Sequence, residues 1–299
     1  GNSYSIKLSK GRIFVSTNGR CLSFDKQTGK YLGSIGHKGE DPKGYSNANC
    51  FIHPHTNNLY FYRQPDKLVK YDTKGNYLGQ VNLPQKISPS LYFTFSDSLI
   101  LAHYGEGIGQ PQASALLYFN EQGEIKDSLP EFANPGNPMG MDQISSINVF
   151  KQLPGNANIG GLIYINYQNG TMTVLPIDQP SLWLSNGSIR FRKAFNDTIY
   201  DIKGHEATVH TTFHTRQWHF PAEKMGQKED TDKYIVITSI LETPNHLFFI
   251  SLQGLYDKKK PFYGIYDKEK HITYMNDATV GLTDDLTHFM PFYPITCTE

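Results

Sequence analysis

The sequence predicts an all-β fold, a six-bladed β-propeller with four-stranded antiparallel blades. Two observations predict it: a composition rich in aromatic and turn-forming residues, and a short sequence motif that is repeated along the chain. The 299 residues include 19 Tyr, 18 Phe, 26 Gly and 17 Pro, and 19% of them are charged. Aromatic residues favour strands, and Gly and Pro favour the turns between them. This composition therefore predicts many short strands joined by many turns.

The second observation is a repeat, in which two polar or turn-forming residues precede an apolar pair. The first apolar residues of these pairs are Ile13, Leu59, Leu99, Ile199 and Leu247. We interpret the gap of 100 residues between Leu99 and Ile199 as two units, so the mean unit is 46.8 residues. A unit of this length has room for the four strands of a propeller blade. We expect the five residues to occupy equivalent buried positions in five different blades.

The repeated units share a polar turn, which follows an aromatic residue at Asp25, Asp72, Asn120 and Asp267. Asp and Asn side chains bond to the backbone two residues on, and Gly, which follows three of the four, adopts positive φ. This phrase predicts a hairpin in each unit. Six units nearly fill the 299 residues and seven would exceed them. We therefore expect a single six-bladed domain over residues 1–299.

The ring of blades is expected to close through the two ends of the chain, with each blade covering the next. Residues 3–9 alternate polar and apolar side chains and precede the first repeat. We expect residues 4–8 to pair with the strand around residues 271–275, or to lie beside it as the innermost strand. This pairing of N- and C-terminal strands would remove a sheet edge.

Blade four, residues 141–180, is the least regular part of the pattern. Strands are expected over residues 161–167 and 171–177. Residues 131–141 are rich in Pro, Gly and Asn, which predicts a long loop at the start of this blade.

The charge balance argues against nucleic acid as a partner. Lys plus Arg and Asp plus Glu both number 28, so the net charge is zero and no basic surface is expected. No stretch approaches the ~18 apolar residues of a membrane helix, and no signal region opens the chain. The chain begins with Gly1, which we interpret as a cloning remnant that follows a removed export signal.

The three cysteines are Cys21, Cys50 and Cys297. They cannot all pair within one chain, and none has the Cys-x-x-Cys spacing of a metal ligand. We interpret them as small buried hydrophobic residues. A disulfide between Cys21 and Cys50 remains open as the alternative.

Four histidines lie within fifteen residues, in the stretch "GHEATVHTTFHTRQWH". His210 and His214 alternate with Val209 and Phe213, which predicts a strand. Strand residues four apart are separated by about 13 Å, too far for both imidazoles to bind one Zn²⁺ at about 2 Å. We expect these histidines on a polar face, with a zinc site completed by other blades as the alternative.

Other candidate residues have similar alternatives. Trp183 and Trp218 are interpreted as packing residues that could stack on a sugar if exposed. His53 and His55 are expected in an exposed turn rather than a metal site. The acidic residues in 228–233 and at 284–285 are expected in solvated turns, with weak Ca²⁺ binding as the alternative.

The motifs of nucleophilic and nucleotide-binding enzymes do not occur in the sequence. It has no Gly-x-Ser-x-Gly elbow, phosphate-binding loop or dinucleotide-binding glycine motif. No catalytic residue and no metal ligand is assigned. The candidates for ligand binding are His210, His214 and Trp218. We expect no cofactor, with bound Ca or Zn as the alternative.

The stretch "SIGHKGEDPKGY", residues 34–45, resembles the glycine-rich link between the first two blades of a family of NHL-like six-bladed β-propeller proteins that Bacteroides-type gut bacteria export. The family pattern is Gly, two residues, Gly, any residue, then Gly-Pro-Gly-Glu-Tyr. The residues that match it are Gly36, Gly39, Pro42 and Tyr45, whereas Asp41, Lys43 and Gly44 replace the family's Gly, Gly and Glu. Residues 195–202 and 274–281 also resemble this family. The resemblance implies six blades, export and often a lipid anchor, and it implies no reaction.

We predict a non-catalytic binding or scaffold module at the cell surface or in the periplasm, with a protein or a glycan as its ligand. It is expected to be a monomer that meets the membrane only through a removed N-terminal lipid anchor. The alternative is a metal-dependent hydrolase or lyase of the NHL-like propeller type, with a site at one end of the axial channel. Stoichiometric Ca²⁺ or Zn²⁺ in the purified protein would favour the enzyme.

Overall fold

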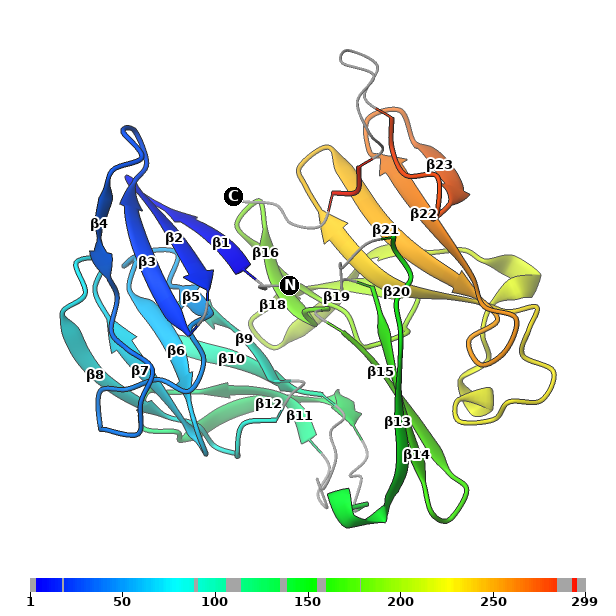
Figure 1. Ribbon diagram of the computed structural model, residues 1–299, viewed down its shortest axis with the longest axis horizontal. Coiled ribbons are helices and arrows are strands. Elements are labelled where there is room, and N and C mark those ends of the chain that lie inside the picture. The colour runs from blue at the N-terminus through cyan, green and yellow to red at the C-terminus, as the bar shows by residue number, and fades with distance from the viewer. Residues whose placement is uncertain are drawn as a thin grey trace. The chain divides into compact units, whose positions relative to one another are not determined.

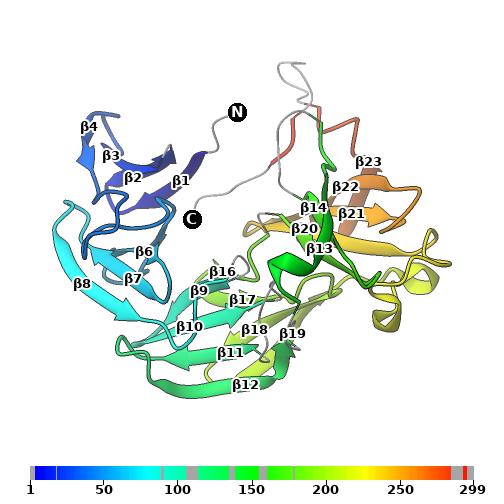
Figure 2. The ribbon, with the colours of Figure 1, turned by 60° about the horizontal axis from the view of Figure 1, so that its bottom comes forward.

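The computed structural model describes residues 4–17, 19–88, 91–105, 114–134, 139–154, 160–177, 179–283 and 292–294. Within these residues the chain forms 23 strands in six antiparallel sheets, five with four strands and one with three (Figures 1 and 2). Strands that follow one another in the chain pair side by side, so each sheet is a meander. The prediction of an all-β fold with antiparallel sheets is confirmed.

The strands divide between two compact units, β1 to β12 in unit 1 and β13 to β23 in unit 2. The single domain over residues 1–299 stays a prediction. No helix in the described part of the chain is both long and apolar enough to cross a membrane.

Unit 1 contains three four-stranded sheets. The first consists of β1 (Tyr4–Ser9), β2 (Arg12–Thr17), β3 (Arg20–Asp25) and β4 (Tyr31–Ser34). The second consists of β5 (Cys50–Ile52), β6 (Leu59–Arg63), β7 (Lys67–Tyr71) and β8 (Tyr77–Asn82). The third consists of β9 (Leu91–Ser96), β10 (Leu99–Tyr104), β11 (Ser114–Phe119) and β12 (Ile125–Asn134).

Unit 2 begins with the three-stranded sheet of β13 (Ile144–Phe150), β14 (Leu162–Tyr167) and β15 (Met172–Pro176). The next sheet consists of β16 (Leu182–Ser185), β17 (Ser188–Phe191), β18 (Thr198–Lys203) and β19 (Glu206–Thr212). The last consists of β20 (Ile235–Glu242), β21 (His246–Gln253), β22 (Lys260–Asp267) and β23 (Ile272–Asp277). Short 3-10 turns span Met141–Gln143, Arg216–Trp218 and Ala222–Lys224.

The four polar turns predicted from the repeated phrase are confirmed. Each joins the third and fourth strands of its sheet, and its Asp or Asn side chain accepts a backbone N–H two residues further on. The glycines that close three of these turns have positive φ of 69°, 90° and 82°, at Gly29, Gly75 and Gly123. Glycine adopts this conformation without steric cost, which explains its place in the phrase.

The predicted equivalence of the five apolar residues is wrong for Ile199. Four of them lie on the second strand of their sheets, whereas Ile199 lies on β18, the third strand. The equivalent turn in that sheet is Asn186-Gly187, where both residues have positive φ and lead into Ile189 on β17. Leu59, Ile199 and Leu247 are buried, and Ile13 and Leu99 are half-buried.

The predicted pairing of residues 4–8 with residues 271–275 is also wrong. β1 pairs with β2 from Tyr4↔Thr17 to Ser9↔Arg12, while β23 completes a sheet with β20 to β22. The reason is local: only two residues separate β1 from β2, and the positive φ of Gly11 allows a tight hairpin there.

The strands expected over residues 161–167 and 171–177 are confirmed by β14 and β15. The expected loop over 131–141 is wrong at its start, because β12 extends to Asn134. Residues 135–138 lie outside the described residues.

Apolar clusters hold the sheets of unit 1 together. Phe14 and Cys21 of the first sheet share a cluster with Leu59 and Phe61 of the second. A further cluster joins the second sheet to the third through residues that include Leu68, Val81, Phe93, Ile100 and Phe119. Cys21 and Cys50 are free and buried, as expected, and Cys297 lies outside the described residues.

In unit 2, the sheet of β20 to β23 is covered on both faces. Phe249 of β21 packs edge-on against Phe213, which follows β19, with ring centroids 5.2 Å apart. From the opposite face, Leu252 shares a cluster with Leu162 and Tyr164 of β14. The expectation that each blade covers the next is therefore wrong for β13 to β15, which pack on a sheet two places further along the chain. Successive side chains of a strand point to opposite faces, and β21 has apolar side chains on both. Both faces of this strand must therefore be covered by other sheets.

Candidate functional site: a buried ion network between two sheets

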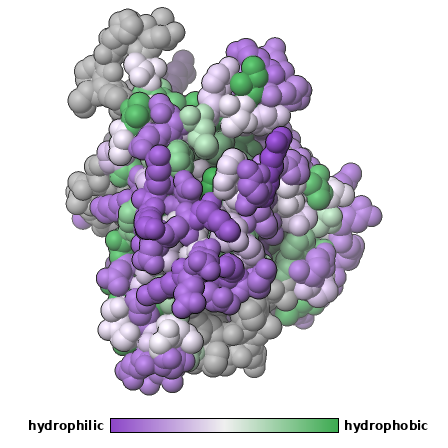
Figure 3. Space-filling model, turned by 90° about the vertical axis from the view of Figure 1, so that its right-hand side faces the viewer, coloured by the Kyte–Doolittle hydropathy of each residue, from purple (hydrophilic) through white to green (hydrophobic). Residues whose placement is uncertain are grey.

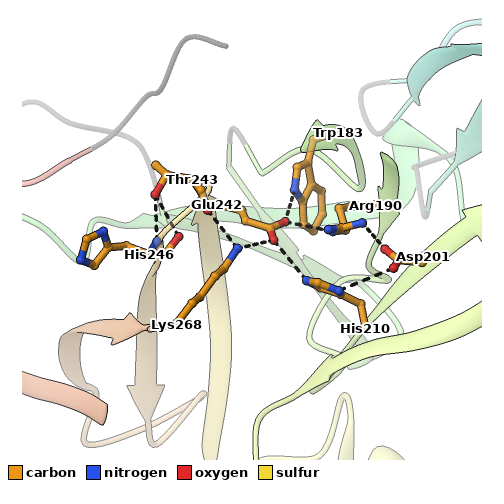
Figure 4. Close-up of polar contacts among 8 residues, drawn as sticks. All are labelled: Trp183, Arg190, Asp201, His210, Glu242, Thr243, His246 and Lys268. Atoms are coloured by element: carbon orange, nitrogen blue, oxygen red, sulfur yellow. Dashed lines mark hydrogen bonds and ion pairs between the residues drawn. The ribbon is translucent and has the colours of Figure 1, made fainter. Parts of the chain in front are cut away.

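The sheet of β16 to β19 carries a row of polar side chains on one face (Figure 4). Trp183 lies directly opposite Arg190, and Arg190 lies directly opposite Asp201. Residues paired in this way across antiparallel strands project from the same face of a sheet. Arg190 is 8% exposed and forms an ion pair with Asp201. The row therefore places a charge pair at the boundary with the next sheet.

Glu242, the last residue of β20, faces this row from the neighbouring sheet, and its side chain is fully buried. Trp183 Nε1 donates to its Oε2 at 3.0 Å, and Lys268 Nζ donates to its Oε1 at 2.7 Å. His210 Nε2 lies 3.2 Å from Oε1, and Arg190 Nε lies 3.3 Å from Oε2. One carboxylate is therefore surrounded by two cationic side chains, an indole and an imidazole.

These neighbours determine the protonation of Glu242. Burial raises the pKa of this carboxyl, but hydrogen bonds from His210, Lys268 and Trp183, with the charge of Lys268, outweigh burial and lower the pKa to about 2. The carboxylate stays ionised at neutral pH, far from the pKa that suits a general acid or base. A buried carboxylate without such partners would be strongly unfavourable, so the network makes its burial tolerable.

His210 on β19 bridges the two carboxylates of the network. Its Nε2 faces Glu242, and its Nδ1 lies 3.6 Å from Asp201 Oδ2. The strand predicted around His210 is confirmed, although it ends at Thr212, before His214. His210 lies on a polar face, as expected, but this face is turned toward the neighbouring sheet: Val209 is 65% exposed, whereas the side chain of His210 is 23% exposed. The partner that draws His210 inward lies on another sheet, which the alternation of a single strand does not indicate.

The turn between β20 and β21 positions the ammonium group of Lys268. Lys268 Nζ donates to the carbonyl of Thr243 at 2.9 Å as well as to Glu242. The hydroxyl of Thr243 accepts the backbone N–H of His246 at 3.1 Å, which closes the turn. The turn therefore holds a carbonyl and a carboxylate against the same cation (Figure 4).

The other candidates from the histidine-rich stretch do not join this network. His214 is exposed, and Trp218 lies on a 3-10 turn with 45% of its surface exposed. His219 Nδ1 lies 2.5 Å from Asp197 Oδ2 in a separate ion pair. Among the residues that the structure describes, no group of three or more His, Cys, Asp or Glu side chains is placed to hold a metal ion.

The turns expected at His53 and at residues 228–233 are present, with His55 exposed as expected but His53 half-buried beside Phe95. His53 Nδ1 accepts the backbone N–H of His55 at 3.2 Å, within a turn that joins β5 to β6. Asp232 forms an ion pair with Lys258 at 3.0 Å. Residues 284–285 lie outside the described residues.

The residues that the sequence did not single out are Arg190, Asp201, Glu242 and Lys268. The one signal available was an acidic residue at the end of a long apolar run, "YIVITSILE", where Glu242 interrupts the pattern. An apolar run predicts a buried strand, and a buried carboxylate needs a cation. The sequence contains no indication of which cations those are.

The comparisons with known proteins agree with an all-β fold and give no activity. The family model described as "Domain of unknown function (DUF4934)" matches residues 1–299. The chain belongs to this family. No curated protein matches the chain significantly.

Solved structures are similar to this DUF4934 chain at low sequence identity. A candidate exported protein from Bacteroides fragilis NCTC 9343 has a TM-score of 0.57 and 14% identity, covering 93% of this chain and 75% of that one. A member of the DUF4221 family from Bacteroides vulgatus ATCC 8482 has a TM-score of 0.49 and 11% identity, covering 93% and 82%. A protein of unknown function from Bacteroides caccae has a TM-score of 0.41 and 10% identity, also covering 93% and 82%.

The glycine-rich link of this DUF4934 chain is held by its surroundings in unit 1. A Cβ at Gly36 would lie 2.7 Å from the ring of Tyr71, and a Cβ at Gly44 would lie 2.4 Å from the carbonyl oxygen of Gly39. Arg63 Nη1 donates to the carbonyl of Gly44 at 3.1 Å. A glycine at position 44, where the resembling family has Glu, is therefore required by a close backbone contact.

Proposed function

We propose that the protein is a non-catalytic binding or scaffold module that acts outside the cytoplasm, with a protein or a glycan as its ligand. The observation that carries this proposal is that both oxygens of the buried Glu242 carboxylate have hydrogen-bond partners. Glu242 is inaccessible, permanently ionised at neutral pH and fully partnered, so it serves to join two sheets and not to transfer protons. A network of this kind stabilises a scaffold.

We further propose that the six meanders are the blades of a closed, NHL-like propeller that reaches the cell surface or periplasm as a monomeric lipoprotein. Four-stranded antiparallel meanders are the unit from which propellers are built, and five of the six sheets have four strands. Export is supported by the candidate exported protein of B. fragilis whose fold is shared. The face drawn in Figure 3 is mostly hydrophilic, with its apolar residues in separate patches, which suits a partner that binds and leaves.

The test compares ligand binding with turnover in the same samples. Binding of wild-type protein and of His210→Ala is measured on a glycan array and by crosslinking to proteins in intact cells. The same two proteins are then assayed for turnover of hydrolase and lyase substrates, with and without Ca²⁺ and Zn²⁺. We expect saturable binding that His210→Ala retains and no turnover by either protein. Turnover that His210→Ala abolishes while its circular dichroism spectrum is unchanged would overturn the proposal in favour of the enzyme.

A further inference from the structure

Two cysteine thiols meet between the first and second sheets of unit 1. Cys21 lies on β3 and Cys50 opens β5, with 0% and 2% of their surfaces exposed. Both side chains belong to the apolar cluster that joins the two sheets, and they lie close enough for Cys50 to raise the pKa of Cys21. The pair takes no part in the ion network of unit 2.

The backbone on both sides of this thiol pair is held in place. Ser16 Oγ donates to the carbonyl of Ala48 at 2.7 Å, which ties the residues before Cys50 to the first sheet. The backbone N–H of Cys21 donates to the hydroxyl of Tyr45 at 3.3 Å. A disulfide needs two cysteine backbones at a restricted separation, and these contacts hold the backbone on both sides at the junction where the two thiols share one cluster.

We propose that Cys21 and Cys50 form a disulfide that covalently joins the first two sheets when the protein folds in an oxidising compartment. The oxidant is a second disulfide, of a small molecule or of a thiol oxidoreductase. One cysteine attacks it to form a mixed disulfide and releases the first thiol, and the other cysteine then displaces the second thiol. Two cysteine protons and two electrons pass to the oxidant, which leaves as two thiols.

Burial determines when this exchange occurs. The contact with Cys50 and burial in the apolar cluster both raise the pKa of Cys21, so the thiolate needed for attack is scarce in the folded protein. Exchange therefore takes place before the two sheets pack. The link closes a loop from residue 21 to residue 50 and restricts the unfolded chain, which stabilises the folded state.

The test uses a Cys297→Ser background, so that the two described cysteines are the only thiols. Protein unfolded in reductant is refolded with either oxidised and reduced glutathione or reductant alone, then unfolded and alkylated with iodoacetamide for intact mass measurement. We expect no alkylation after oxidative refolding, two alkylated thiols after reductive refolding, and a melting temperature several degrees higher for the oxidised form. In the additional Cys50→Ser variant this difference in melting temperature should vanish.

Two alkylated thiols after oxidative refolding would overturn the proposal, as would an oxidised form that melts no higher than the reduced one. The role of the link in the cell rests on the proposed location outside the cytoplasm. The redox state of the pair in the cell is tested separately, by quenching intact cells with acid and alkylating the free thiols. If the pair is reduced there, cell fractionation shows whether the protein is in the cytoplasm, which contradicts the proposed location, or outside it, which contradicts the disulfide.

Discussion

Units 1 and 2 are built from the same meander but join their sheets by different physical means. In unit 1, the junction of the first two sheets is an apolar cluster that contains Phe14 of the first sheet and Phe61 of the second. Around Phe61 the cluster is aromatic: Tyr45, in the link between the sheets, stacks with ring centroids 4.7 Å apart, and Tyr71 packs edge-on at 5.9 Å. In unit 2, a buried carboxylate, Glu242, lies between sheets with cationic partners on both sides.

The difference teaches where each unit is sensitive. Apolar packing responds to side-chain volume and hardly at all to pH, because no group in it titrates near neutrality. A buried charge network tolerates less chemical change, because removal of one member leaves the others uncompensated. The following variants test whether unit 1 is more sensitive to changes in side-chain volume and unit 2 to changes in charge.

The largest effect is expected from Phe61→Ala in unit 1. Removal of a fully buried ring leaves a cavity against Tyr45 and Tyr71, which should lower the free energy of unfolding by about 4 kcal/mol. Urea unfolding followed by far-UV circular dichroism measures it. The control, Phe61→Leu, should lose less than half as much, and a loss below about 1 kcal/mol in Phe61→Ala would contradict the packing role of this ring.

Glu242→Gln should have the next largest effect. The variant keeps the shape and one oxygen but removes the charge that faces Arg190 and Lys268, so we expect a loss of about 3 kcal/mol. Both tryptophans lie in unit 2, so their fluorescence during urea unfolding reports on this unit. Glu229→Gln, in an exposed turn, is the matched control and should change nothing measurable. Equal stability of the two variants would contradict the network's role.

Acid should weaken unit 2 through the same carboxyl. The pKa of Glu242 is about 2 in the folded protein and 4.5 ordinarily, so its contribution is present above pH 4.5 and is lost as the pH falls towards 2. Between pH 6 and pH 3, the loss should be about 2 kcal/mol greater in wild type than in Glu242→Gln. Urea titrations of both proteins at the two pH values measure it, and parallel losses would show that other carboxyls carry the acid sensitivity.

Sequence reasoning succeeded where the cause of structure is local and failed where it is distant. The turns at Asp72 and Asn120 were predicted because their hydrogen bonds span two to four residues. Ile199 was misassigned because its apparent repeat was chosen by spacing, while the true equivalent follows the Asn186-Gly187 turn. A mean period of 46.8 residues concealed sheets of unequal length.

The candidate site was mostly hidden from the sequence for the same reason. Glu242 lies 32 residues from His210 and 59 from Trp183 in the chain. The sequence around each of these residues does not indicate that they contact one another. His210 was singled out for its neighbours in the chain, yet its role depends on Glu242. The order in which sheets pack in unit 2 likewise departs from chain order, and neither periodicity nor turn chemistry encodes it.

The smallest expected effect concerns the one device that the two units share, the Asp turn between the third and fourth strands. Asp72 in unit 1 accepts the backbone N–H groups of Lys74 and Asn76 at 2.8 Å. Asp267 in unit 2 accepts those of Glu269 and Lys270 at 3.0 and 2.9 Å. Because the bonding is matched, Asp72→Ala and Asp267→Ala should each lower the free energy of unfolding by about 1 kcal/mol. Asn retains the oxygen that the turn uses, so Asp72→Asn and Asp267→Asn should stay close to wild type in the same urea titrations. A clearly larger loss at Asp267 than at Asp72 would mean that this turn also positions Lys268, its neighbour in the chain, and that the ion network of unit 2 extends into the hairpin.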